Sequence, residues 1–419
     1  MQSVKVLPPR SSLRTSSSDW VNNRFKMKML SFLIMLCLFI YVVMHGVASL
    51  HQHQSTRIEA AWHHFDPLMV RDKTPVKVDN LPQGIVHAES DMELKPLWLI
   101  KNSMSKIRVL VMTEYFQTML LRFLGAGMHS DNGRSHQNLL AIPAGIKQKR
   151  NVDAIVRKFV AEKFTIILFH YDGNVNGWHD LPWSKEAIHI AATNQTKWWF
   201  AKRFLHPDVL STYDYIFLWD EDLEVDNFHP RSYLEIMKSE GLEISQPGLD
   251  PILSEVHHKI TMRSKDRRVH RKIYNDRGGS RCSESNKGPP CSGWVEGMAP
   301  VFSNAAWRCA WHLIQNDLIH GWGLDFKLGY CAQGDRTKKV GVIDSEFVVH
   351  RGIKTLGVSS KEKKQQGARV DVRVEIRRQS KSELEIFQKR WDEAVRNDRD
   401  WIDPYKHTKS RRKKHNPLS

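Results

Sequence analysis

Short apolar runs alternate with helical patterns from residue 139 onward, and this alternation constrains the fold more than any other feature of the chain. The apolar runs predict buried strands at residues 139–145, 164–173, 186–192 and 213–222. Helical patterns separate them at residues 151–163, with Asn151 as the expected cap, and 196–206. Because strand–helix–strand units imply parallel strands, we expect an α/β fold whose ligands lie at the carboxyl ends of the strands.

The second part of this region is less regular. We expect a helix at 305–318, a strand at 340–350 and a late helix at 382–397, opened by a capping box of Ser382 and Glu385. The folded domain is predicted to cover residues 138–405, with its Rossmann-like half at 138–226. A basic tail, 406–419, follows it.

Residues 29–50 predict a membrane anchor. These 22 residues contain no Asp, Glu, Lys or Arg, and about 20 residues of helix span a bilayer core. Basic residues precede the run, which leaves a cytosolic tail at 1–28 under the positive-inside rule. We therefore expect a type II membrane protein of the Golgi or another endomembrane compartment, with a stem at 51–137 before the luminal domain.

Cysteine usage agrees with an oxidising lumen. Besides Cys37 in the predicted anchor, the chain has four cysteines. A short surface loop separates Cys282 from Cys291, so we favour that disulfide, which leaves Cys309 to pair with Cys331. Without a C-x2-C pair, a structural zinc site is a poor alternative.

Acidic residues cluster directly after the apolar run at 215–219. Asp220, Glu221 and Asp222 follow it, and alternation along an extended chain puts Asp220 and Asp222 on one side. Two carboxylates there can hold a hard divalent cation that also binds phosphate oxygens. The alternative is an ordinary polar loop, since D-x-D occurs by chance in many chains.

This D-x-D motif and three other elements resemble the GT-A class of glycosyltransferases. In that class D-x-D holds Mn²⁺ or Mg²⁺ on the diphosphate of a nucleotide sugar. HGWGLD, residues 320–325, is similar to the W-G-x-E-D motif, although Leu324 replaces its Glu. The resemblance implies that Asp325 is the catalytic base of an inverting reaction and that His350 is the third metal ligand, beside Asp220 and Asp222.

The segment EGMAP resembles the small-residue loop near the donor sugar, which implies donor contacts for Glu296 and Gly297. Residues 138–357 also resemble, at length, a plant family of uncharacterised proteins labelled "lysine ketoglutarate reductase trans-splicing related". The sequence contains neither the G-x-G-x-x-G of a reductase nor an RNP-type motif, so the label itself does not follow from the residues.

Further residues are candidates for donor binding. Asp172 ends a predicted strand and is a candidate for nucleoside binding, or simply a turn residue before Gly173. Lys197 is placed to neutralise a diphosphate, or is a solvated charge. Trp322, like Trp178 and Trp183, is expected in a loop, where its ring either stacks on a sugar or packs in the core.

The sequence therefore predicts a metal-dependent glycosyltransferase of the secretory pathway, with a nucleotide-sugar donor and a glycan or other hydroxyl acceptor. The fold expected is a GT-A-like mixed sheet with a nucleotide-binding half. Two alternatives stay open. One is a luminal sugar- or nucleotide-binding protein without catalysis. The other is a nucleic-acid binder, suggested by the net charge of +17 but disfavoured by a luminal location, so no nucleic-acid partner is expected.

Overall fold

The computed structural model describes residues 80–88, 90, 138–274, 282–283, 288–352 and 372–405 of the chain. The predicted cytosolic tail, anchor, basic tail and most of the predicted stem lie outside these ranges. Among the residues described, none of the helices combines the length and apolar character needed to cross a bilayer.

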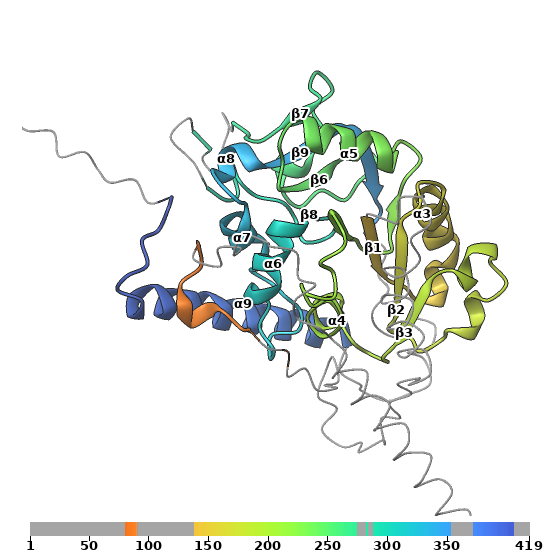
Figure 1. Ribbon diagram of the computed structural model, residues 1–419, viewed down its shortest axis with the longest axis horizontal. Coiled ribbons are helices and arrows are strands. Elements are labelled where there is room, and N and C mark those ends of the chain that lie inside the picture. The colour runs from red at the N-terminus through yellow and green to blue at the C-terminus, as the bar shows by residue number, and fades with distance from the viewer. Residues whose placement is uncertain are drawn as a thin grey trace, which may run out of the picture. The chain divides into compact units, whose positions relative to one another are not determined.

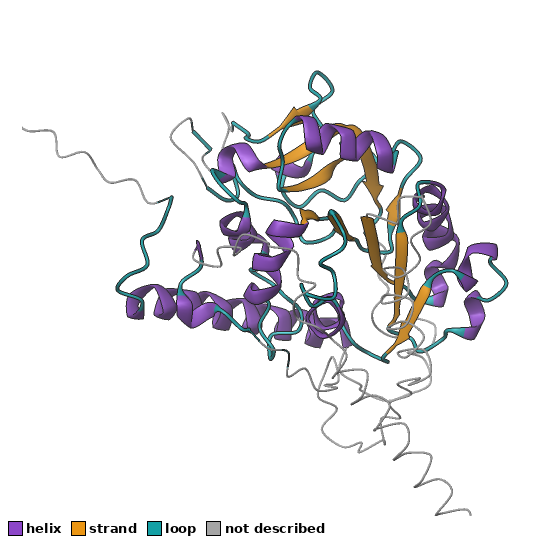
Figure 2. Ribbon diagram, in the orientation of Figure 1, coloured by secondary structure: helices purple, strands orange, loops and turns teal. Residues whose placement is uncertain are grey.

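A mixed sheet forms the centre of this part of the chain (Figures 1 and 2). Its strand order is β3-β2-β1-β4-β8-β6-β9-β5, and β7 pairs with β9. In chain order the strands are β1 (Asn138–Pro143), β2 (Thr165–His170), β3 (Ile188–Ala191), β4 (Tyr215–Leu218), β5 (Leu223–Glu224), β6 (Ile244–Leu249), β7 (Val269–His270), β8 (Val301–Ser303) and β9 (Val340–His350). The predicted α/β class with a mixed sheet is confirmed.

The strands of the first half are parallel, as the alternating pattern predicts. β1 lies between β2 and β4 and pairs in parallel with both, and β2 pairs in parallel with β3. Helix α3 (Lys149–Ala161) connects β1 to β2, and α4 (Lys197–Phe204) connects β3 to β4. The carboxyl ends of these four strands therefore lie at one edge of the sheet, with the loops that follow them.

The second half of the sheet brings distant segments beside the end of β4. β8 pairs antiparallel with β4, and the two residues of β5 pair antiparallel with the end of β9. β6 joins the two, because it pairs antiparallel with β8 and parallel with β9. These pairings, rather than local sequence, decide which loops meet the acidic cluster.

Both faces of the sheet are buried under helices. In β1, Leu139 and Ala141 pack on one face, and Leu140 and Ile142 pack on the other. The first face is covered by α4, α6 (Asn304–Leu313) and α9 (Val372–Asn397), and the second by α3 and α5 (Pro230–Ser239). This double burial explains why β1, β2 and β4 are near-continuous apolar runs instead of alternating with polar residues.

Two predicted helix caps are wrong. Helix α3 begins at Lys149, and Asn151 inside it donates its side-chain amide to the carbonyl oxygens of Glu221 and Leu223. Ser382 and Glu385 lie in the interior of α9, which begins at residue 372. Buried side chains from Ile376 to Ala394 continue along α9, so tertiary packing overrides the local capping signal.

Residues 80–88, which the sequence assigns to the stem, pack against the domain. Leu81 and Ile85 are fully buried in the core beneath α9. The ammonium group of Lys202 donates a 2.8 Å hydrogen bond to the carbonyl oxygen of His87, and Gln315 donates one of 2.9 Å to that of Ile85. The contacts span more than a hundred residues of sequence, which is why the local composition does not reveal them.

The structure contains both predicted disulfides, Cys282–Cys291 and Cys309–Cys331. Cys309 lies on α6, and Cys331 ends the short helical stretch after α7 (Asp325–Leu328). The second disulfide therefore ties α6 to the segment that follows the HGWGLD motif.

Two buried histidines, His170 and His189, lie next to each other, and His170 contacts the loop after β1. His170 Nε2 is 2.7 Å from His189 Nδ1, and His170 Nδ1 is 3.2 Å from the carbonyl oxygen of Ala144. His189 Nε2 in turn lies 3.1 Å from the hydroxyl oxygen and 2.9 Å from the carbonyl oxygen of Ser184. Two neutral imidazoles satisfy this chain if the Ser184 hydroxyl donates to His189, His189 donates to His170 and His170 donates to Ala144. Burial, with the charge of His189, lowers the pKa of His170 to about 3.

We expect this pair to destabilise the domain in acid. Because the pKa of His170 is below its unfolded value of 6.5, the unfolded chain binds more protons between these two pH values. The contribution of His170 to the free energy of unfolding is therefore complete above pH 6.5. It decreases by about 2–3 kcal/mol as the pH falls two units below that value. Urea unfolding of wild type and His170→Gln near neutral pH and in mild acid measures this loss. Equal pH dependence in the two proteins would contradict the prediction.

Candidate functional site

The acidic cluster lies where β4 ends, beside the EGMAP segment. The backbone N–H of Asp220 donates a 2.8 Å hydrogen bond to the carbonyl oxygen of Met298, and that of Leu218 donates one of 3.1 Å to Pro300. These bonds extend the antiparallel pairing of β4 with β8. The register between the two strands thus places the segment 296–300 next to Asp220.

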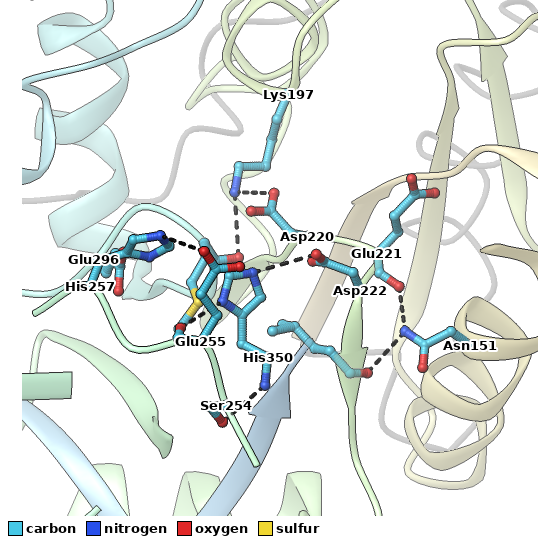
Figure 3. A network of polar contacts seen from close by, with 12 residues as sticks. Asn151, Lys197, Asp220, Glu221, Asp222, Ser254, Glu255, His257, Glu296 and His350 are labelled. Atoms are coloured by element: carbon cyan, nitrogen blue, oxygen red, sulfur yellow. Dashed lines mark hydrogen bonds and ion pairs between the residues drawn. The ribbon is translucent and has the colours of Figure 1, made fainter. Parts of the chain in front are cut away.

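Lys197 binds both of these segments. It is the first residue of α4, which Thr196 caps through a hydrogen bond from the N–H of Trp199. Its ammonium group lies 2.6 Å from Asp220 Oδ1 and donates a 2.5 Å hydrogen bond to the carbonyl oxygen of Gly297. The side chain is only 8% exposed, so Lys197 is a buried cation and not a solvated charge (Figure 3).

Asp222 meets His350 through the pairing of β5 with β9, in which Leu223 lies opposite His350. His350 Nε2 is 3.4 Å from Asp222 Oδ2. Burial alone would lower the pKa of His350, but the hydrogen bond and charge of Asp222 outweigh it and raise the pKa to about 9. The loop after β6 also contacts the ring, because His350 Nδ1 lies 3.3 Å from the carbonyl oxygen of Glu255. The backbone N–H of His350 donates to Ser254 Oγ at 3.1 Å.

Glu221 points away from this group (Figure 3). Its carboxylate accepts hydrogen bonds from the N–H of Gly145, at 2.7 Å, and from the hydroxyl of Tyr171. Burial raises the pKa of Glu221 to about 8. Glu221 therefore ties the D-x-D segment to the loops after β1 and β2, while Asp220 and Asp222 face Lys197 and His350.

The charge of Glu296 interacts both with the D-x-D side of the site and with Asp325. Its Oε1 is 3.3 Å from His257 Nδ1, and its Oε2 is buried without a hydrogen-bond partner among the described residues. The pKa of Glu296 is raised by burial, against the opposing charges of His257 and His350. An unpaired buried carboxylate oxygen is costly, which marks this atom as a place where a ligand hydroxyl group can donate.

Asp325 begins the short helix α7, and its Oδ1 accepts a 2.9 Å hydrogen bond from the N–H of Phe326. Burial, with repulsion from Glu296 as a smaller cause, raises the pKa of Asp325 to about 7. A carboxylate with this pKa can accept a proton near neutral pH. The charge interaction with Glu296 links Asp325 to the group around Asp220.

The remaining candidates have other surroundings. Asp172 accepts hydrogen bonds from the backbone N–H groups of Ile146, at 2.7 Å, and Asn174, at 3.0 Å, so both of its oxygens already stabilise turns. Trp178 and Trp183 are buried in the core and do not form a sugar platform. Trp322 is 47% exposed.

The sequence analysis missed several residues that complete the site. His257 and Glu255 come from the loop after β6, and Gln246, in β6, accepts a 2.6 Å hydrogen bond from the N–H of Glu296. No sequence motif identifies these residues, because they reach the site only through the pairing of β6 with β8 and β9. A search for charged residues at the carboxyl end of β6 would have indicated His257 and Glu255.

The side chains around the D-x-D fit a divalent cation by donor type. The carboxylate oxygens of Asp220 and Asp222 suit Mn²⁺ and Mg²⁺, whereas the imidazole nitrogen of His350 is a ligand of the kind that transition metals prefer. In this structure Asp220 binds Lys197 and Asp222 binds His350. Over the ranges that the structure describes, no group of three or more His, Cys, Asp or Glu side chains is arranged to hold a metal ion.

Residues 109–397 match the model of a protein family described as "Protein of unknown function (DUF707)". This description does not repeat the plant label named above. No curated protein matches the chain.

Solved structures resemble the chain only distantly. S. aureus TarS 1-349 has a TM-score of 0.35 at 6% identity, over 51% of this chain and 59% of that one. TarS 1-349 in complex with UDP scores 0.30 at 8% identity, over 62% and 70%. The glycosyltransferase GlyE of Streptococcus pneumoniae TIGR4 scores 0.28 at 10% identity, over 63% and 64%. The chain thus spans 59% of the first structure, and scores this low carry no argument about chemistry.

Proposed function

This chain belongs to the family described as "Protein of unknown function (DUF707)", and from the geometry of its site we propose that it is a glycosyltransferase. The donor is a nucleotide sugar, and the acceptor carries a hydroxyl group. The observation that carries the proposal is the meeting of two cationic side chains, Lys197 and His350, with Asp220 and Asp222 at the carboxyl end of β4.

The two cationic side chains bind the donor diphosphate. The ammonium group of Lys197 is fixed by Asp220 and by the carbonyl oxygen of Gly297, and the ring of His350 by Asp222 and the carbonyl oxygen of Glu255. Held in this way, both charges lose little conformational freedom when phosphate oxygens replace the surrounding water. They stabilise the charge that develops on the leaving nucleoside diphosphate.

When Mn²⁺ or Mg²⁺ binds, Asp220, Asp222 and the neutral form of His350 would hold it, and the ion would supply the positive charge at the diphosphate in place of the His350 imidazolium. On the other side, Asp325 accepts the proton of the acceptor hydroxyl group as its oxygen attacks the sugar. Glu296 accepts a hydrogen bond from a sugar hydroxyl through its unpaired Oε2. With Lys197 and His350 acting on the leaving group and Asp325 acting on the nucleophile, both are stabilised at the same time.

We propose the endomembrane lumen as the location. The two disulfides support it, because such bonds persist in oxidising compartments. The apolar run at 29–50 is the proposed anchor, with a type II orientation. Protease protection of the C-terminal tail in microsomes tests this topology, and digestion without detergent would contradict it.

Nucleotide binding tests the proposed function directly. Calorimetric titration of the full chain with UDP and GDP, with Mn²⁺ and with EDTA, should show binding of at least one nucleotide. Lys197→Met should weaken that binding about tenfold or more, because a charge-assisted hydrogen bond to phosphate is lost. Lys147→Met, at an exposed site on the neighbouring loop, should bind as wild type does.

Hydrolysis of the matching nucleotide sugars separates an enzyme from a binding protein. Turnover that Mn²⁺ increases supports a metal-dependent transferase. Tight binding without turnover of any donor would favour the non-catalytic alternative. If neither nucleotide binds, or if Lys197→Met binds like wild type, the proposed donor site is wrong.

A further inference from the structure

Trp322 is exposed, unlike the other tryptophans in the described ranges, which are buried or half-buried. Leaving 47% of a tryptophan side chain in water forfeits part of the hydrophobic stabilisation that its burial would give. Exposed aromatic surface of this kind often marks a binding site. Whether the turn that carries Trp322 is rigid follows from the packing of the residues on either side of it.

The turn that carries Trp322 is fixed on both sides by glycines. Gly321 has φ +68°, and a Cβ there would lie 2.3 Å from the ring of Trp198. Gly323 has φ +94°, and a Cβ there would lie 2.8 Å from the Leu384 side chain on α9. Both positions require glycine for conformation and for space, so the backbone on each side of Trp322 is closely packed.

Two buried contacts between His320 and Glu383 attach the same turn to helix α9. The backbone N–H of His320 donates a 2.8 Å hydrogen bond to Glu383 Oε2, and His320 Nδ1 lies 2.8 Å from Glu383 Oε1. The two side chains are only 5% and 6% exposed. A rigid turn thus exposes Trp322 to solvent. Little conformational entropy of the protein is lost when a ligand covers the ring.

A second exposed aromatic side chain lies one residue beyond Asp325. Phe326 is 37% exposed, and its ring packs at 6.0 Å from Trp294 and 6.5 Å from His258 between ring centroids. Only Tyr274 is otherwise an exposed large aromatic residue in the part of the chain that the structure describes. Two of these three rings therefore flank the candidate base in sequence.

We propose that Trp322 and Phe326 bind a pyranose ring of a carbohydrate acceptor and bring one of its hydroxyl groups to Asp325. The proposal rests on the glycosyltransferase function proposed above and names the acceptor class. A pyranose has an apolar C–H face, which packs on an aromatic ring, and an edge of hydroxyl groups, which needs polar partners. Aromatic rings close in sequence to a carboxylate offer both, whereas a lipid chain would desolvate the Asp325 carboxylate, whose Oδ1 accepts a hydrogen bond from the N–H of Phe326.

Binding of the full chain to an array of oligosaccharides of hexoses, pentoses and uronic acids tests the proposal. Wild type should bind at least one of them. Trp322→Ala should lose affinity for it about tenfold or more, because tryptophans at binding sites commonly carry that much free energy. Trp322→Phe should retain most of the affinity, since an aromatic face remains. Tyr274→Ala removes an equally exposed aromatic ring elsewhere and should bind as wild type does.

Nucleotide titration of the same proteins distinguishes this inference from the proposed function. If wild type binds UDP or GDP, but no oligosaccharide binds or Trp322→Ala binds them undiminished, the carbohydrate platform is wrong and the donor site stands. If oligosaccharides bind through Trp322 but no nucleotide binds, the platform stands as a sugar-binding surface and the transferase proposal fails.

Discussion

Replacing Asp325 with Asn should lower the rate of sugar transfer by about 10²-fold or more, because general-base catalysis typically contributes that much. Asn has nearly the same shape but does not accept the proton of the acceptor hydroxyl group. Donor binding should stay nearly unchanged, since Glu296, and neither Lys197 nor His350, is among the charges that shift the pKa of Asp325. Transfer rates and nucleotide titrations of both proteins measure the two effects separately.

The pH dependence provides a second readout for Asp325. Because burial raises its pKa to about 7, the base is protonated below that pH and the wild-type rate should rise as the pH increases through 7. The Asn variant should lack this rise. Asp266→Asn, at an exposed site outside the candidate site, is the matched control. Equal transfer rates in wild type and Asp325→Asn would remove the base assignment and favour a retaining mechanism or a binding protein.

Replacing Asp222 with Asn should weaken metal and donor binding together. The change removes a carboxylate from the proposed cation site and also the partner that fixes His350 at 3.4 Å. Changes to groups that orient a metal ligand typically cost about 10- to 100-fold in affinity, and loss of a ligand should cost at least as much. Calorimetry with Mn²⁺ alone, and then with UDP or GDP in its presence, follows both losses.

Glu224→Gln is the matched control for Asp222→Asn. Glu224 lies two residues further along the chain and forms an ion pair with Arg351 at 2.7 Å. Both side chains of that pair are partly exposed, so its loss should change stability little. If Asp222→Asn loses nucleotide affinity but Mn²⁺ does not bind even to wild type, the carboxylate acts through His350 and the metal proposal is wrong.

Much of the first half of the fold could be predicted because its signals are local. The buried parallel strands are apolar on both faces, and the helices between them have the expected lengths, so β1 to β4 lie close to the predicted ranges. The position of Asp220 and Asp222 after β4 is also local, since it needs only the end of a strand and its alternation. The motif resemblance supplied Glu296, Asp325 and His350, but not how they are held.

The caps show where local signals fail. Ser382 and Glu385 have the spacing of a capping box, yet the helix runs through them, because Phe387 and Trp391 are buried on a face that continues from Ile376. Asn151 has the right residue type for a cap, yet it binds the backbone after the D-x-D. In both cases long-range packing contributes more free energy than a cap, which is worth about 1 kcal/mol.

The sequence by itself determined which segments form the parallel sheet, which cysteines pair and which strand ends in carboxylates, because each depends on neighbours in the chain. Only the tertiary structure decided that Lys197 binds Asp220, that His257 meets Glu296 and that Glu383 clamps His320. These contacts join residues 23, 39 and 63 positions apart in the sequence, and the pairings of β8 with β4 and of β9 with β5 bring Glu296 and His350 to the same site. The free energy that selects those pairings is spread over the whole core, so no local pattern records it.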